Sequence, residues 1–250
     1  MNIQQYVTRF NASIPKEVSL TRLAELQGQH LQHIPFENLD VIRKVPIYLN
    51  LQSIFSKIVQ DKRGGYCYEL NGLFQSLLTA LGYDSHLVAA TVLRPNGQWA
   101  KADTHAAILV QLDQPYLVDV GFGAATPRSP IPLDGTEQTD INGTYKVMQA
   151  HDGTFDLIQV NELGIRTLYR FHTDKKSLVD FHEGCVFNQV AKESSFTHYD
   201  IVSCATKTGR ITLTDRTLTV IDNGIQTTSE LSAEEKVNVL QDVFKLTSVD

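Results

Sequence analysis

The sequence has few cysteines and lacks the spacings by which cysteine and histidine bind metals. Only three cysteines occur in 250 residues, and an odd number at wide spacing does not form a disulfide framework. CxxC, HExxH and EF-hand patterns are missing, so we expect no metal. Free thiols are typical of a reducing compartment, and we therefore expect a cytoplasmic protein.

Long apolar runs and clusters of positive charge are missing as well. The first ten residues do not combine a basic segment with an apolar one, which predicts no signal peptide. No apolar run approaches the roughly 20 residues of a membrane-spanning helix. Lysine and arginine are scattered, and the net charge is −6. Since nucleic acid and anionic membranes both bind clustered basic faces, we expect neither as a partner. The sequence leaves the oligomeric state open.

What is present divides into three stretches of different texture. Up to about residue 83, apolar residues recur every three or four positions, which predicts helices in SLTRLAELQGQHLQHI, LQSIFSKIVQ and CYELNGLFQSLLTALGY. Residues 84–190 form short strand-like runs separated by turn signals, which predicts a barrel or a sandwich. Residues 191–250 contain further strands and a final helix that opens with the capping-box pair Ser232 and Glu235.

Cys67 stands at the predicted start of a helix, directly behind a glycine pair, in RGGYCYEL. A helix N-terminus stabilises negative charge, and the thiolate is the nucleophilic form of cysteine. Gly64 and Gly65 allow a sharp turn and leave the sulfur uncrowded. From its local setting alone, Cys67 could be either a reactive thiolate or a small buried hydrophobic residue. For Cys185 and Cys204 we favour the buried hydrophobe.

His105 and Asp119 are the candidate partners of the thiol. His105 directly precedes the apolar run AAILVQL, and Asp119 interrupts the apolar strand YLVDVGFG. A buried carboxylate is costly unless it is paired, and its natural partner is the imidazole on the neighbouring strand. The carboxylate would fix the tautomer of the imidazole and stabilise the imidazolium that forms when Cys67 loses its proton. A tight hairpin centred on Asp113 and Gln114 places Asp119 opposite Ile108, about 10 Å from His105. The pair thus requires a wider turn, a bulge or strong twist. A strand-edge histidine and an aspartate bonded to backbone amides remain the alternatives.

The glycine-rich segment VGFGAATP follows this strand. Thr126 stands where a dinucleotide-binding turn has its third glycine, and Pro127 follows it, so the segment is neither a Rossmann turn nor a P-loop. A loop of this kind can still present backbone N–H groups to phosphate oxygens.

Several segments together resemble the arylamine N-acetyltransferase family. RGGYCYELN resembles the family signature RGGxCxExN, and HIPFENLD resembles its PFENL segment. Thr104–His105 and VDVGFG follow in the family's order and spacing, and GRITLTD resembles a strand of its third domain. The likeness covers nearly the whole chain. Glu37 and Arg63 are then expected to form a structural ion pair between the first two motifs.

The resemblance implies an α+β fold with a cysteine-protease-like arrangement of the triad. We expect a helical bundle with the nucleophile over residues 1–83, a central β-barrel with the histidine and aspartate over 84–190, and an α/β lid over 191–250. The implied catalytic residues are Cys67, His105 and Asp119.

The resemblance also implies ping-pong acetyl transfer. The thiolate attacks the thioester of acetyl-CoA, the co-substrate, and the acetyl-cysteine then passes its acetyl group to an arylamine, arylhydrazine or arylhydroxylamine. The expected coenzyme contacts are Thr104, Gly121, Phe122 and Gly123, and the expected acceptor pocket contains Phe36, Val92 and Phe196. AKESSF, which contains Phe196, lacks a proline found in many relatives.

Other classes share part of this pattern. A thiol hydrolase of the papain or transglutaminase type has the same order of cysteine, histidine and aspartate, and an amide synthase is a variant of the transferase. The segments around Phe36 and Phe122, which proteases do not need, favour the transferase. A non-catalytic homologue that binds CoA or a small aromatic is disfavoured because all three triad positions are occupied.

Overall fold

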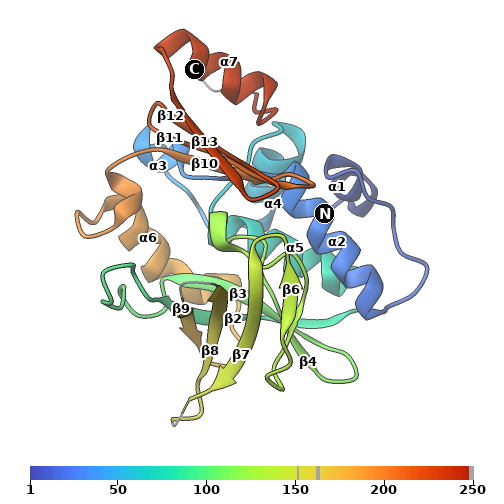
Figure 1. The fold of residues 1–250 in the computed structure, drawn as a ribbon. Helices are drawn as coiled ribbons and strands as arrows, with labels where there is room; N and C mark the ends of the chain where they lie inside the picture. Colours follow the sequence, from blue (N-terminus) through green and yellow to red (C-terminus); the bar gives the residue numbers. More distant parts are fainter. Residues whose placement is uncertain (151, 162–163, 248–250) are drawn as a thin grey trace.

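The computed structural model describes residues 1–150, 152–161 and 164–247. In this part of the chain the helices of the N-terminal third lie between a large curved sheet and a smaller sheet formed mainly by the C-terminal third (Figure 1). The helices are α1 (Ile3–Arg9), α2 (Leu20–His33), α3 (Leu39–Ile42), α4 (Leu51–Phe55), α5 (Cys67–Ala80), α6 (His182–Val190) and α7 (Ala233–Asp242). A π-helical turn, Ser56–Gln60, extends α4.

All strand pairs are antiparallel within the described residues, and they form an eight-stranded and a five-stranded sheet. The larger sheet, ordered β5-β4-β3-β2-β9-β8-β7-β6, nearly closes into a barrel because β5 also contacts β7. The smaller sheet is ordered β1-β10-β11-β12-β13 and carries α7 on one face (Figure 1). The strands are β1 (Phe36–Glu37), β2 (Asp84–Val92), β3 (His105–Gln111), β4 (Pro115–Val118), β5 (Ile131–Pro132), β6 (Gln138–Asp140), β7 (Gly143–Gln149), β8 (Phe155–Asn161), β9 (Gly164–Phe171), β10 (Ile201–Ala205), β11 (Gly209–Thr214), β12 (Thr217–Asp222) and β13 (Ile225–Glu230).

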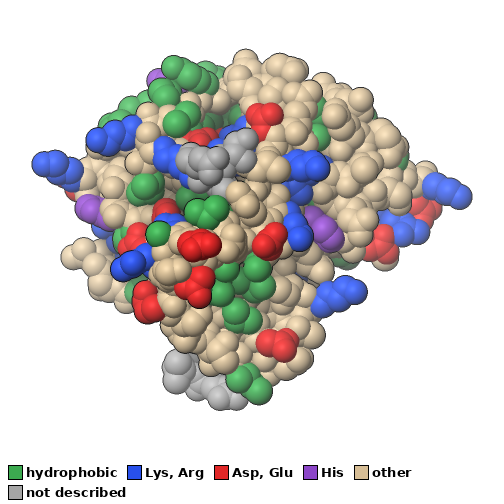
Figure 2. All heavy atoms as spheres, turned by 90° about the horizontal axis from the view of Figure 1, so that it is seen from above, with side chains coloured by type: hydrophobic (Ala, Val, Ile, Leu, Met, Phe, Trp, Pro, Cys, Tyr) green, Lys and Arg blue, Asp and Glu red, His purple; other side chains and the backbone are tan. Residues whose placement is uncertain are grey.

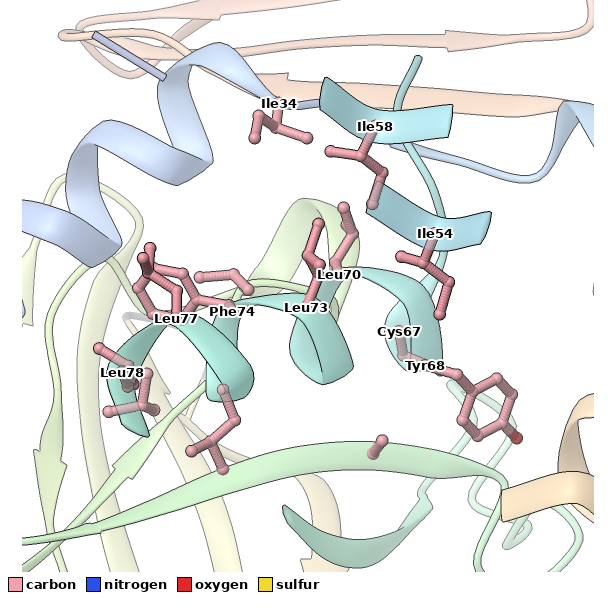
Figure 3. Packing of buried hydrophobic residues seen from close by; sticks show 14 of the residues in the cluster. Ile34, Ile54, Ile58, Cys67, Tyr68, Leu70, Leu73, Phe74, Leu77 and Leu78 are labelled. Carbon is pink, nitrogen blue, oxygen red and sulfur yellow. The ribbon is translucent and has the colours of Figure 1, made fainter. Parts of the chain in front are cut away.

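The helical periodicity of the N-terminal third corresponds to real helices that bury one face. Ser19 caps α2 by accepting a hydrogen bond from the Arg22 N–H, as a helix N-cap does. Helix α5 is buried along most of its length between the barrel strands β2 and β3 and the other helices. In Figure 3, Leu70 and Leu73 of α5 point toward the side on which Ile58 lies. Helix α5, which begins with Cys67, is thus held by the main hydrophobic core.

We expected strands throughout residues 84–190, but the last part of this stretch is the helix α6. A 3-10 turn over Leu178–Phe181 leads into α6. The Asp180 carboxylate accepts hydrogen bonds from the N–H group and the hydroxyl of Ser177, each at 2.7–2.8 Å. This Ser-x-x-Asp pair is a capping box, which favours the start of a helix even directly after a region of strands.

Charge is distributed rather than concentrated on the face seen in Figure 2, where acidic and basic side chains are interspersed over α7 and the smaller sheet. Among the described residues no helix is both long enough and apolar enough to cross a membrane.

A buried ionic cluster lies at the entry to α5. Arg63 donates to Glu37 at 2.8 and 3.0 Å and to Asp40 at 2.8 Å. The ammonium group of Lys57 lies 2.7 Å from Asp40 and 2.8 Å from Glu69. The ion pair expected between Glu37 and Arg63 is therefore present, within a larger cluster. It joins the PFENL segment to the loop that leads into α5.

We expect Lys57→Met to lower the free energy of unfolding by about 3–5 kcal/mol, because it leaves buried carboxylates without their counterion. Burial by itself lowers the pKa of Lys57, but the three neighbouring carboxylates raise it above its ordinary value. Urea unfolding measures the change. Arg22→Met is the matched control, since the one ion pair of Arg22 within the described residues is an exposed pair with Glu25. Equal, small effects of the two substitutions would contradict a structural role for the cluster.

Candidate active site

Cys67 is the first residue of α5, and its side chain is buried. The preceding Tyr66 is the N-cap, and the Glu69 carboxylate accepts a hydrogen bond from the Tyr66 N–H at 3.2 Å. The glycine pair serves close packing rather than a left-handed turn. A Cβ at Gly64 would collide with the carbonyl oxygen of Pro35, and one at Gly65 would lie 2.9 Å from the Glu69 side chain. The chain thus enters the helix pressed against the PFENL segment.

Asp119 lies just beyond a strand rather than in its middle. Strand β4 ends at Val118, which pairs with Ile108, so the expected pairing of Asp119 with Ile108 is wrong by one residue. The shift brings Asp119 one step closer to His105, and leaving the strand frees its backbone to turn. The Oδ2 atom of Asp119 then lies 2.7 Å from the Nε2 atom of His105, the first residue of β3.

Four hydrogen bonds hold the buried Asp119 carboxylate. Its Oδ2 atom accepts from Tyr169 at 3.0 Å besides bonding His105. Its Oδ1 atom accepts from the Asn71 side chain at 2.8 Å and from the Gly121 N–H at 2.7 Å. Both oxygens are therefore satisfied, which offsets the cost of removing the carboxylate from water.

The charge of Asp119 sets the protonation of His105. Burial by itself lowers the pKa of His105, but the charge of Asp119 and its hydrogen bond outweigh that effect. Together with a hydrogen bond to Cys67, they raise the pKa of His105 to about 10. Since Nε2 bonds Asp119, the other ring nitrogen, Nδ1, is left for the thiol. An imidazolium ion therefore lies beside the sulfur at neutral pH.

Helix α6 braces the segment that carries His105. The carbonyl oxygen of Thr104 accepts hydrogen bonds from Tyr68 at 2.8 Å and from Asn188 at 3.3 Å, and Asn188 also donates to the Tyr68 hydroxyl at 3.2 Å. A Cβ at Gly184 would lie 2.6 Å from that hydroxyl, so α6 approaches as closely as a glycine allows. The peptide before His105 is thereby held by one residue of α5 and one of α6.

A single cavity of about 380 Å³ contains the thiol and the imidazole. Every residue that the sequence placed at the coenzyme or the acceptor lines it: Thr104, Gly121, Phe122, Gly123, Phe36, Val92 and Phe196. The Phe36 and Phe196 ring centroids are 6.0 Å apart, and the Phe122 ring lies edge-on to His105 at 5.2 Å. In the described part of the chain no group of three or more histidine, cysteine or acidic side chains could hold a metal ion.

Sequence reasoning missed four residues that hold Asp119 or the peptide before His105. Asn71 was visible as the last letter of RGGYCYELN, but its bonds to Asp119 and to the Val120 N–H were not. Tyr68 and Tyr169 look like ordinary core tyrosines, and both are fully buried. Asn188 had one weak signal, its spacing of four residues from Gly184, which places both on one face of a helix.

Comparison with known proteins identifies the family. A family model described as N-acetyltransferase matches residues 19–249. The arylamine N-acetyltransferase of Escherichia coli K12 is 33% identical over 227 residues, which cover 89% of this chain and 80% of that protein. This chain belongs to the arylamine N-acetyltransferase family. The liver isozyme of the same name from Gallus gallus is 32% identical over 98% of this chain and 96% of its own length. The predicted family and its enzyme class, acyltransferase, are confirmed.

Solved structures of arylamine N-acetyltransferases share the fold. The Bacillus cereus enzyme, described as having a unique Cys-His-Glu triad, superposes with a TM-score of 0.93 at 26% identity and covers 99% of both chains. The Mycobacterium marinum enzyme in complex with CoA gives a TM-score of 0.91 at 31% identity, over 98% of this chain and 93% of that one. The predicted α+β fold is confirmed. The acidic residue beside His105 in this chain is an aspartate.

We expect the His105 ring to keep both protons at pH 8 and to lose one near pH 10, as ¹⁵N NMR of histidine-labelled protein would show. Because the folded pKa exceeds the unfolded value of about 6.5, the stability that the pair contributes is complete below about pH 6.5. It is lost as the pH rises through about 10. His105→Gln assigns the resonance, and Asp119→Asn is expected to lower the pKa. Deprotonation of wild-type His105 near pH 6.5 would refute the assignment.

We expect Asn188→Leu to slow alkylation of Cys67 by iodoacetamide about tenfold at neutral pH and to shift the pH profile of that rate. The substitution removes the two donors that hold Thr104 and Tyr68, worth about 1 kcal/mol each. Gln189→Leu is the control, because Gln189 is the next residue of α6 and bonds Ile47 and Cys185 rather than Thr104 or Tyr68. A folded Asn188→Leu variant with the wild-type profile would show that α6 does not position the histidine.

Proposed function

We propose that this protein transfers the acetyl group of acetyl-CoA to an arylamine, arylhydrazine or arylhydroxylamine through an acetyl-Cys67 intermediate. One observation carries the proposal: a thiol at a helix N-terminus lies beside an imidazolium that a buried carboxylate holds, within a cavity large enough for a small aromatic. Membership of the family supports the same chemistry.

In the first half-reaction the Cys67 thiolate attacks the carbonyl carbon of the acetyl thioester. The developing oxyanion is stabilised by backbone N–H groups at the start of α5, which have no partner within the helix. The carbon–sulfur bond to the coenzyme then breaks, and the departing thiolate takes a proton from the His105 imidazolium. CoA leaves as the thiol, and Cys67 carries the acetyl group.

In the second half-reaction the amine attacks acetyl-Cys67. His105, now neutral, accepts a proton from the amine nitrogen as the new amide bond forms. The Cys67 thiolate leaves, and the imidazolium beside it is restored. Asp119 orients the ring through both half-reactions and stabilises its charged form.

The glycine-rich loop supports a coenzyme site at Thr104, Gly121, Phe122 and Gly123. A Cβ at Gly121 would lie 2.7 Å from the Cα of Cys67, so the loop crosses directly over the nucleophile. A coenzyme held along this loop would bring its thioester to the sulfur. For the acceptor we propose the apolar walls Phe36, Val92 and Phe196, which lie across the same cavity.

The compartment and the division of the chain are proposals too. We place the protein in the cytoplasm because its three cysteines are free and free thiols persist in reducing compartments. We divide the chain into a nucleophile-bearing bundle (1–83), a barrel (84–190) and a lid (191–250). The two sheets and the helices between them support this division.

Incubation with acetyl-CoA and no acceptor is expected to add one acetyl group to the protein, located on Cys67 by peptide mass spectrometry. A later addition of 4-anisidine should remove the label. Cys67→Ser should take up no acetyl group, since Cys185 and Cys204 lie outside the cavity lining. The proposed mechanism would be refuted if acetyl-CoA left Cys67 unmodified while iodoacetamide still alkylated it.

A further inference from the structure

The cavity contains one cationic side chain without an acidic partner in the described lining. Of the described residues that line it, none is acidic, and Arg94 is the one lysine or arginine. The protonated His105 lies in the same cavity. His105 is already paired with Asp119, so among the described lining residues Arg94 is the cation that an anionic substrate group could neutralise.

Arg94 is held in place without being neutralised. It follows β2 at the start of a hairpin, where its backbone N–H bonds the carbonyl of Gln98 at 2.9 Å. Its guanidinium donates to the backbone carbonyl of Glu193 at 3.1 Å, next to the 3-10 turn Ser195–Thr197. Among the described residues it forms no ion pair within 4.0 Å. A guanidinium has five N–H donors, and the bond to Glu193 uses only one of them.

The position of Arg94 fits a substrate that extends away from the sulfur. Ala90 pairs with His105 across β2 and β3, and Arg94 lies four residues further on, about 13 Å along the strand. The flexible side chain of Arg94 shortens this gap. Val92 lies between the two positions and lines the cavity as an apolar wall. An aromatic ring against that wall, with its amine at Cys67, would direct a substituent on its far side toward Arg94.

We propose that Arg94 forms a subsite for an anionic substrate group and that it selects aromatic acceptors bearing a carboxylate opposite the amine. The inference rests on the proposed function and specifies its substrate class. Guanidinium and carboxylate match as a bidentate, charge-assisted pair. A phosphate of acetyl-CoA offers similar chemistry, but the phosphates lie at the far end of the pantetheine arm from the thioester.

The anionic group at Arg94 could be the carboxylate of the acceptor or a phosphate of acetyl-CoA. Ping-pong kinetics separate the two, because kcat/KM for each substrate reports its own half-reaction. The acceptor test compares 4-aminobenzoate with 4-aminobenzamide, which has nearly the same shape and no charge. In Arg94→Met we expect the ratio of their kcat/KM values to fall about tenfold, the loss of one charge-assisted interaction. Lys101→Met is the control, since Lys101 bonds Glu183 at 2.9 Å and does not line the cavity. Its ratio should stay at the wild-type value.

The coenzyme test compares acetyl-CoA with S-acetyl-N-acetylcysteamine, a thioester without phosphates. A selective loss with acetyl-CoA in Arg94→Met would keep the anion subsite and assign it to the coenzyme. The subsite is refuted if Arg94→Met, with a wild-type melting temperature, changes neither ratio of kcat/KM values: that of 4-aminobenzoate to 4-aminobenzamide, or that of acetyl-CoA to S-acetyl-N-acetylcysteamine. That result differs from failure of the proposed function, in which wild-type protein forms no acetyl-Cys67 and acetylates neither acceptor.

Discussion

The hydrogen bond between Asp119 and His105 is the interaction around which the site is built. It holds a buried negative charge where α5 meets the barrel, and the fold surrounds that charge with donors from α5, β9 and the glycine-rich loop. Each donor comes from a different part of the chain, so the helices and the barrel must meet in one arrangement for the carboxylate to be satisfied. The protonated imidazole beside the thiol is the chemical result.

The sequence contained the site's main residues but not the geometry that joins them. Helical periodicity located α5, and the unusual place of Cys67 and Asp119 among their neighbours marked them as chemical. The register predicted for β3 and β4 was wrong by one residue. It depends on the turn over 112–114, where no Asn-Gly or similar signal fixes the turn type. A one-residue change alters which residues meet across the pair, and here it decides whether the pair can form.

The brace from α6 lay beyond sequence reasoning for a different reason. Asn188 is separated from Tyr68 by 120 residues, and its spacing from Gly184 indicates no more than a shared helix face. Its function follows from the close approach of α6 to α5, which exists only in the folded molecule. The ionic cluster at Arg63 was partly foreseen, because Glu37 and Arg63 fall in the two motifs; Lys57 falls in neither.

Around the nucleophile, backbone meets backbone or side chain at Gly64, Gly121 and Gly184 with no room for a Cβ atom. Where a glycine faces a side chain, replacing that side chain with a smaller one can make room for a larger residue. At Gly64 and Gly121 the opposing atoms include main chain, so no partner substitution can restore the space. Transplanting this thiol into another scaffold would therefore require copying three separate chain crossings, and moving the triad side chains alone would not suffice.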